Sequence, residues 1–149
     1  MQVIFTYSLS YGLDVMALLR PLLMDNVPSI QQSAALALGR LAGYNEELAD
    51  AIVNEKILPT LVKSLEEQNK HYKKTAAYVL QNVARHNSTL AKNVVDAKAL
   101  QYLMFCLEDF DPAVKTAAAW AIAFIAKHSE ELARAVVDAG GVEYLVACV

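Results

Sequence analysis

A 42-residue repeat runs through the chain and constrains its fold more than any other feature. The segment at 34–38, AALAL, recurs as AAYVL at 76–80 and as AAWAI at 118–122. Leucine recurs at the same spacing at positions 19, 61, 103 and 145, with no insertion or deletion between the copies. A fixed period of this length is typical of solenoids, in which each unit buries its apolar face against its neighbours.

Each repeat carries signals for three helices. The first helix begins at a capping residue (Asn45, Asn87 or Ser129), whose side chain can accept a hydrogen bond from a free backbone amide of the first turn. The second has Pro59 in its first turn, where proline is tolerated. The third follows a break such as Asp111-Pro112, in which Asp caps the helix and Pro takes the first helical position. The apolar residues of the third helix recur with helical spacing on one face.

Three helices in about 42 residues place the chain in the HEAT/armadillo class. Short first helices, a long third helix and a bend of small residues at 136–142, with a degraded copy at 94–100, favour armadillo over HEAT. We therefore predict an all-α, right-handed armadillo solenoid of about three and a half repeats over residues 13–149, a fragment of a longer stack. Residues 1–12 do not match the repeat and are expected to form a separate N-terminal segment. Self-association through the uncovered ends of the stack is expected.

Several segments resemble one armadillo family closely. They are LRPLL at 19–23, QQSAALALGRLA at 31–42, LEDFDP at 107–112, AAAWA at 117–121 and KHSEEL at 127–132. All are similar to the N-terminal repeats of the sperm-associated antigen six family, armadillo proteins of the central apparatus of motile cilia and flagella. The resemblance covers about residues 13–149 and includes loop residues that an armadillo core does not need. It implies a cytoplasmic, cytoskeletal scaffold of the axoneme that stabilises the central microtubule pair and supports motility, with central-apparatus proteins as partners.

By analogy with other armadillo solenoids, the third helices line a concave groove that binds extended partners. The position that carries Trp in nuclear-import adaptors is occupied here by Leu36, Tyr78 and Trp120. The position that carries Asn is occupied by Arg40, Asn82 and Phe124. One indole and one amide remain, and they lie in different repeats. Binding of a basic peptide in the manner of an import adaptor is therefore disfavoured.

The charge pattern predicts the opposite preference. The chain has 13 basic and 16 acidic residues, but six of the basic residues and none of the acidic ones lie in the third-helix windows 29–44, 71–86 and 113–128. A concave basic surface attracts acidic segments, such as tubulin tails or acidic stretches of axonemal proteins. The alternative that these cations only solvate helix ends stays open. The predicted groove residues are Arg40, Lys73, Lys74, Tyr78, Asn82, Arg85, Lys115, Trp120, Phe124 and Lys127.

The sequence predicts no catalytic, metal or cofactor site. His86 and His128 lie in the last turns of third helices, and a structural role at helix ends is favoured because no Cys or carboxylate shares their spacing. Cys106 and Cys148 fall on equivalent helices about 8–10 Å apart, too far for a disulfide, so both are expected to be reduced. The acidic residues at 66–67 and 108–111 are expected in solvated turns. No catalytic triad, phosphate loop or zinc spacing is present, so the chain is not expected to be an enzyme.

Further classes are disfavoured on composition. No run of eighteen apolar residues predicts a membrane span, and no secretory signal is recognised, so an intracellular setting is expected. Acidic flanks and few aromatic residues disfavour nucleic acid. The leading hypothesis is an axonemal scaffold; the alternatives are a nuclear-import or catenin-type adaptor and an idealised engineered repeat, which the irregular groove positions disfavour.

Overall fold

The computed structural model describes the backbone of residues 2–147, with the side chains of residues 11, 12 and 14–147. Within this part of the chain all regular structure is helical, as predicted. The helices are α1 (Gln2–Leu22), α2 (Pro28–Tyr44), α3 (Glu46–Asn54), α4 (Leu58–Ser64), α5 (Lys70–Ala84), α6 (Ser88–Asp96), α7 (Ala99–Leu107), α8 (Pro112–Ala126), α9 (Glu130–Asp138) and α10 (Gly141–Ala147). No helix among these combines the length and apolar character needed to cross a membrane.

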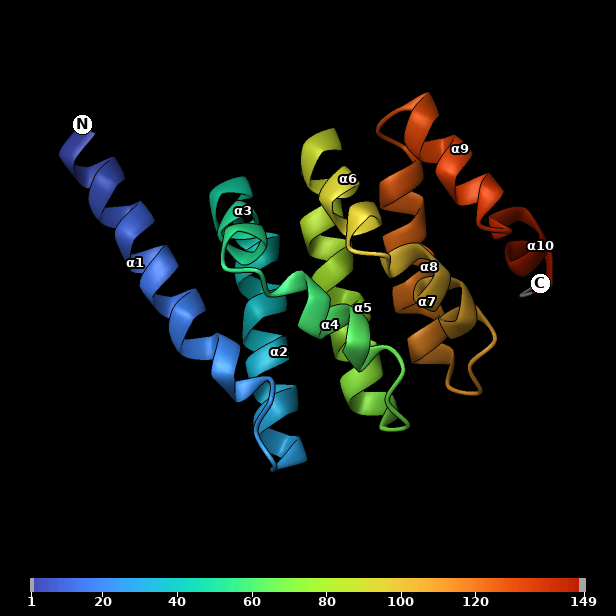
Figure 1. Cartoon of the computed structure of the whole chain (residues 1–149), viewed down its shortest axis with the longest axis horizontal. Coiled ribbons are helices and arrows are strands. Elements are labelled where there is room, and N and C mark those ends of the chain that lie inside the picture. Colours follow the sequence, from blue (N-terminus) through green and yellow to red (C-terminus); the bar gives the residue numbers. More distant parts are fainter. Residues whose placement is uncertain (1, 148–149) are drawn as a thin grey trace.

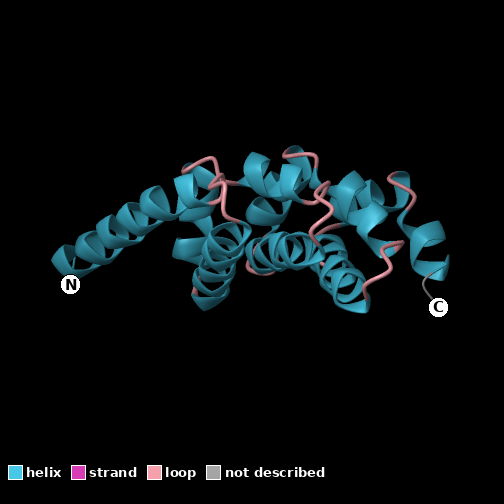
Figure 2. Ribbon diagram, turned by 90° about the horizontal axis from the view of Figure 1, so that it is seen from below, coloured by secondary structure: helices cyan, strands magenta, loops and turns pink. Residues whose placement is uncertain are grey.

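The helices form two complete repeats flanked by partial ones. Helices α3–α5 and α6–α8 are the complete units, α1 and α2 precede them, and α9 and α10 follow (Figure 1). The third helices α2, α5 and α8 are 17, 15 and 15 residues long, whereas α3, α4, α6 and α7 have 7 to 9 residues. Seen edge on, the molecule is a shallow arc with α2, α5 and α8 side by side on its inner side (Figure 2). The long third helices therefore line the concave face.

The predicted caps are confirmed. Asn45, Asn87 and Ser129 each accept a hydrogen bond from the backbone N–H three residues later, at 2.8, 2.8 and 3.2 Å. Asp111 accepts from the N–H of Ala113 at 2.8 Å, and Pro112 begins α8. Each cap satisfies a backbone amide that has no partner within its helix.

The bend between the first and second helices of a repeat depends on one left-handed residue. Lys56, Lys98 and Gly140, each 42 residues apart, have φ angles of 54°, 66° and 85°. The bends predicted at 94–100 and 136–142 are thus confirmed, although two of the three residues are lysines that adopt this conformation at a cost of about 1 kcal/mol. Asp14 holds the same register in α1, but there the helix is continuous from Gln2 to Leu22. The predicted division of the chain at residue 12 stays a prediction.

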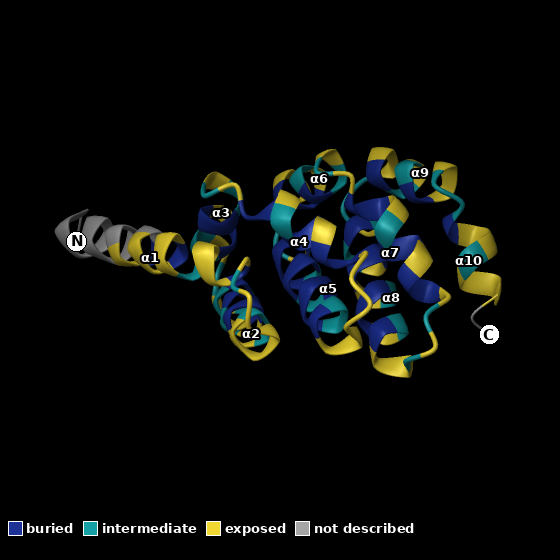
Figure 3. Cartoon of the chain, turned by 60° about the horizontal axis from the view of Figure 1, so that its bottom comes forward, coloured by how far each residue is buried: buried dark blue, intermediate teal, exposed yellow. Residues whose placement is uncertain are grey.

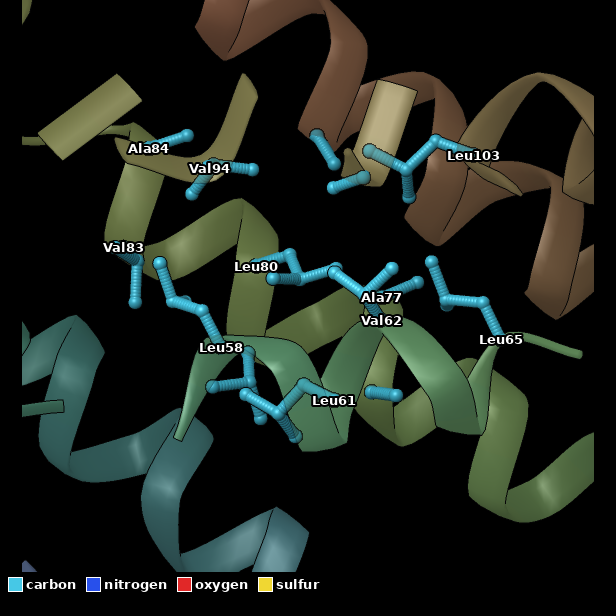
Figure 4. Packing of buried hydrophobic residues seen from close by; sticks show 14 of the residues in the cluster. Leu58, Leu61, Val62, Leu65, Ala77, Leu80, Val83, Ala84, Val94 and Leu103 are labelled. Carbon is cyan, nitrogen blue, oxygen red and sulfur yellow. The ribbon is translucent and has the colours of Figure 1, made fainter. Parts of the chain in front are cut away.

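The core lies between the row of third helices and the row of shorter ones. Leu58 and Leu61 of α4, and Leu65 directly after it, belong to the same buried cluster as Leu80 and Val83 of α5 (Figure 4). All five are buried, and burying a leucine side chain contributes about 1.5–3 kcal/mol. Because the same pattern recurs every 42 residues, the core is continuous along the stack.

The two ends of the stack leave apolar side chains uncovered. Leu61 and Leu103 are fully buried, whereas Leu145 at the same register is 38% exposed. On α1, Tyr11 and Leu18 are largely exposed. Figure 3 shows exposed residues along α1 and α10, in contrast to the buried inner faces of the central helices. A third helix covers the leucine in the complete repeats, and within the described residues none follows α10.

Candidate functional site

The candidate site is the concave face made by α2, α5 and α8. Neither Asp nor Glu occurs in these three helices. A hollow of about 590 Å³ lies between α5 and α8 and reaches Leu36 of α2. Its walls are mostly apolar, and Tyr78, Trp120 and Leu36, the three residues at the predicted Trp-type position, all contribute to them. The structure therefore brings two predicted groove residues, Tyr78 and Trp120, together with Leu36.

Gly39 determines where the ring of Tyr78 lies. A Cβ atom at Gly39 would stand 2.5 Å from Cδ1 of Tyr78, so only glycine leaves room for this ring against α2. Tyr78 is consequently half-buried between α2 and α5. Gly39 was not among the predicted site residues. The sequence signal that could have identified Gly39 is its small size, because the equivalent residues in the next two repeats are Gln81 and Ala123.

Three predicted groove residues form one stack: Trp120 and Phe124 of α8, and Lys127 directly after it. The Trp120 and Phe124 rings are 5.7 Å apart between centroids with an interplanar angle of 28°. Lys127 Nζ lies 4.4 Å from the centroid of Phe124, a cation–π contact. Trp120, at the outer end of the stack, is 54% exposed. This end of the groove thus offers a large aromatic surface with a cation behind it.

The side chain of Asn82 is buried, so its amide is not offered to a binding partner. It is 3% exposed, and its Nδ2 donates to the carbonyl oxygen of Tyr78 at 3.0 Å. Its Oδ1 accepts from Nη1 of Arg85 at 3.4 Å. The amide is already engaged within α5, so the surface here is provided by Arg85.

Lys73 is also committed within the protein. Its Nζ lies 2.6 Å from Oδ2 of Asp109, in the loop before α8, and both side chains are largely buried. Burial raises the pKa of the Asp109 carboxyl, but the hydrogen bonds from Lys73 and from the backbone N–H of Asp111 outweigh burial, and this pKa lies below its usual value. The neighbouring pair of Lys70 and Asp111 is separated by 3.1 Å. The expectation that these aspartates lie in solvated turns was wrong for this reason: both bind α5.

The other predicted groove cations remain available. Over the residues whose side chains the structure describes, no ion pair involves any of them. They are Arg40, Lys74, Arg85, Lys115 and Lys127. Lys115 has the register of Lys73, whereas Lys74 lines the hollow. The concave face is therefore basic even when the lysines that form ion pairs within the protein, Lys70 and Lys73, are not counted.

The two histidines connect successive third helices. His86 Nε2 lies 2.5 Å from the carbonyl oxygen of Ala42 at the end of α2, and His128 Nε2 lies 2.7 Å from that of Ala84 at the end of α5. A carbonyl only accepts, so Nε2 donates in both cases. The carbonyls belong to the preceding repeat, and each histidine satisfies a group without a partner in its own helix.

The described residues contain no group of three or more His, Cys, Asp or Glu side chains arranged to hold a metal ion. Burial raises the pKa of the Cys106 thiol to about 11, so this side chain is a neutral thiol at pH 7. Cys148 lies outside the described residues, and the predicted separation of the two cysteines stays a prediction.

The similarity of the sequence to known proteins is local. Over 60 residues, 40% of the chain, it is 70% identical to sperm-associated antigen 6 of Mus musculus and 68% identical to sperm-associated antigen 6 of Homo sapiens. The match spans 12% of the length of those proteins. No protein-family model matches the chain. The resemblance predicted from the motifs is confirmed over this segment.

The solved structures similar to the chain include designed armadillo repeat proteins. A designed armadillo repeat protein superposes with a TM-score of 0.84 at 27% identity, covering 87% of this chain and 54% of the design. A second design, solved in complex with the peptide (KR)4, has a TM-score of 0.84 at 29% identity over 87% of this chain and 54% of its own. An engineered protein reaches 0.86 at 34% identity, over 90% of this chain and 55% of its own. The predicted armadillo architecture is confirmed.

Proposed function

We propose that this armadillo-repeat solenoid is a non-catalytic, protein-binding scaffold whose concave groove holds extended acidic segments of partner proteins. The observation that carries the proposal is the charge of the groove. Its three helices contain no acidic residue, and five of the predicted groove cations lack an ion-pair partner among the described side chains. A concave surface of one sign concentrates the potential and attracts segments of the opposite sign.

The setting we propose is the central apparatus of motile cilia and flagella. The 70% identity to sperm-associated antigen 6 over 60 residues supports this setting, together with the motifs shared along residues 13–149. In the cytoskeleton of the axoneme the acidic partners would be central-apparatus proteins or the acidic tails of tubulin. By holding such segments along a rigid stack, the scaffold would support the microtubule pair and flagellar beating.

The alternative is an adaptor of the nuclear-import or the catenin type. An adaptor of the nuclear-import type binds basic segments. The design solved with (KR)4 shows that the armadillo fold accommodates a basic peptide. Two features of the present chain disfavour that ligand. The amide of Asn82 is engaged within α5, and the third helices carry cations without any carboxylate to pair with a basic peptide.

The test is a binding titration with two synthetic peptides that differ only by Glu in place of Lys. We expect the acidic peptide to bind and its affinity to fall as salt is raised, and the basic peptide not to bind. The triple variant Lys74→Glu, Arg85→Glu and Lys127→Glu should abolish binding. The matched control, Lys56→Glu, Lys63→Glu and Lys98→Glu, changes the net charge equally at exposed positions outside the third helices and should bind as the parent does. Preference for the basic peptide, or unchanged binding by the groove variant, would refute the proposal.

We also propose that this chain self-associates through the exposed apolar side chains of α10. Leu145, Val142 and Val146 are exposed, although Leu103, Leu100 and Met104 at the same register are buried. Sedimentation velocity over a range of concentrations tests this. The expected result is a mass that rises with concentration in the parent and less so in Val146→Glu, and a strictly monomeric profile contradicts the proposal.

A further inference from the structure

We infer that the groove selects acidic segments that also carry an apolar anchor: the hollow between α5 and α8 takes one aliphatic or aromatic side chain, and Lys74 pairs with a carboxylate next to it. This inference rests on the proposed function and specifies the chemistry of its ligand. Its basis is the combination of an apolar hollow with a single unpaired cation among its lining residues.

The hollow is built to take an apolar group. It measures about 590 Å³, and the rings of Tyr78 and Trp120 and the side chain of Leu36 lie along its walls. Leu36 and Trp120 are both exposed, so apolar surface from two repeats faces solvent in one place. A side chain inserted there would remove this surface from water, which is the main favourable contribution of apolar contacts to binding.

Trp120 is more exposed than the aromatic ring at the same register in the preceding repeat. Tyr78 lies against Gly39, where a Cβ atom would meet its ring. The residue at the register of Gly39 in the next repeat is Gln81, which lines the hollow together with Trp120. Trp120 is 54% exposed, whereas Tyr78 is half-buried.

The charges around the hollow exclude a basic anchor. Lys74 lies in its lining, and none of the third helices supplies a carboxylate. The nearby aromatic face of Phe124 already carries the chain's own cation, Lys127, 4.4 Å from the ring centroid. A Lys or Arg from a partner would thus approach Lys74 with no carboxylate on the third helices to compensate for the repulsion.

The experiment uses the fluorescence of Trp120, which is the single tryptophan of the chain. Three peptides of equal length are titrated: an acidic peptide with a central Leu, the same peptide with a central Ser, and a Lys-rich peptide with a central Leu. We expect the acidic Leu peptide to shift the emission to shorter wavelength and to bind about tenfold more tightly than the acidic Ser peptide, the ratio expected for burying one apolar side chain. The Lys-rich peptide should not bind.

Two variants locate the anchor, with affinities measured by calorimetry. Thr116→Phe fills the hollow and should remove the advantage of Leu over Ser while leaving the affinity of the Ser peptide unchanged. Gln32→Phe, at the same register on α2 and not among the residues that line the hollow, is the matched control and should keep the advantage. Lys74→Met should weaken both acidic peptides.

The outcomes separate this inference from the proposed function. If both acidic peptides bind equally, or if Thr116→Phe retains the advantage of Leu, the anchor is refuted and the acidic groove stands. If neither acidic peptide binds, both proposals fail. Tighter binding of the Lys-rich peptide would also overturn both.

Discussion

The complete repeats and the ends of the stack have similar sequences but different surroundings. Leu103, in the second complete repeat, is fully buried, whereas Leu145 at the same register is 38% exposed. The bend residue Lys98 is left-handed, whereas Asp14 at the same register lies within the continuous helix α1. The repeat therefore determines which helices form, and the neighbouring repeat determines whether their apolar faces are covered.

The links between repeats show the same contrast. His86 and His128 each hold the end of the preceding third helix, but Tyr44, at their register in the first repeat, is 80% exposed. Lys73 reaches Asp109 of the following repeat, whereas Lys115 has no ion-pair partner among the described residues. Each repeat therefore contributes a few side chains that stabilise only when the adjacent repeat is present.

The largest difference in stability between a complete repeat and an end of the stack should come from the leucines at equivalent positions. Leu103→Ala should lower the free energy of unfolding by about 2–5 kcal/mol, because it leaves a cavity among packed side chains. Leu145→Ala should lower it by less than about 1 kcal/mol, since part of that side chain is already in water. Urea denaturation followed by circular dichroism measures both. Equal losses would show that α10 is as well covered as α7.

The next largest loss of stability should come from removing the ion pair between Lys73 and Asp109. Asp109→Asn should lower the free energy of unfolding by about 1.5 kcal/mol, because it removes the charged partner of Lys73. Lys115→Met, at the register of Lys73 but without a partner among the described side chains, should change it by less than about 0.5 kcal/mol. Urea denaturation at pH 7 checks both values.

The same pair predicts a dependence on pH. The pKa of Asp109 is lowered in the folded state, so its contribution is complete above the usual Asp pKa of about 4 and is lost as pH falls through the lowered folded value. The difference between the parent and Asp109→Asn should accordingly shrink on acidification. A difference that stays constant from neutral to acidic pH would contradict the assignment.

The hydrogen bonds of His86 and His128 to the preceding repeat should contribute less to stability than the ion pair does. His86→Ala and His128→Ala should each lower the free energy of unfolding by about 1 kcal/mol, the net value of one hydrogen bond to a helix end. Tyr44→Ala, at the same register and exposed, serves as the control and should change it by less than about 0.5 kcal/mol. If Tyr44→Ala is as destabilising as the histidine variants, the links do not distinguish the complete repeats from the first one.

The smallest effects, with opposite signs, should appear at the bend. Lys98→Gly should raise the free energy of unfolding by about 0.5–1 kcal/mol, since glycine adopts the left-handed conformation without steric cost. Asp14→Gly should lower it by about 0.3–0.5 kcal/mol, because there the backbone is helical. Thermal and urea unfolding of the two variants would give the same sign only if α1 also bends at this register.

Much of the fold could be predicted because the signals are local. Asn87 caps α6 and Asp111 caps α8 through backbone amides two or three residues away, so the capping residue and its partner lie in one short segment. The repeat then places each segment relative to its copies. The continuity of α1 through Asp14 was not foreseen, because two lysines at the same register adopt the left-handed bend and composition does not distinguish these cases.

The candidate site could be predicted only in part. The helical period correctly brought Leu36, Tyr78 and Trp120 to one surface. The pairing of Lys73 with Asp109, 36 residues away, depends on how the loop before α8 approaches α5. The burial of Asn82 likewise depends on the packing of α5 against α2, where Gly43 approaches its amide.

The sequence by itself determined the 42-residue period, the caps, the armadillo class and the concentration of basic residues on the third helices. These properties follow from backbone chemistry and side-chain spacing within one repeat. Only the tertiary structure decided which of those cations are free, which aromatic ring is exposed and where the hollow lies. Each of these depends on what the neighbouring helix places opposite, as Gly39 of α2 does for the ring of Tyr78 on α5.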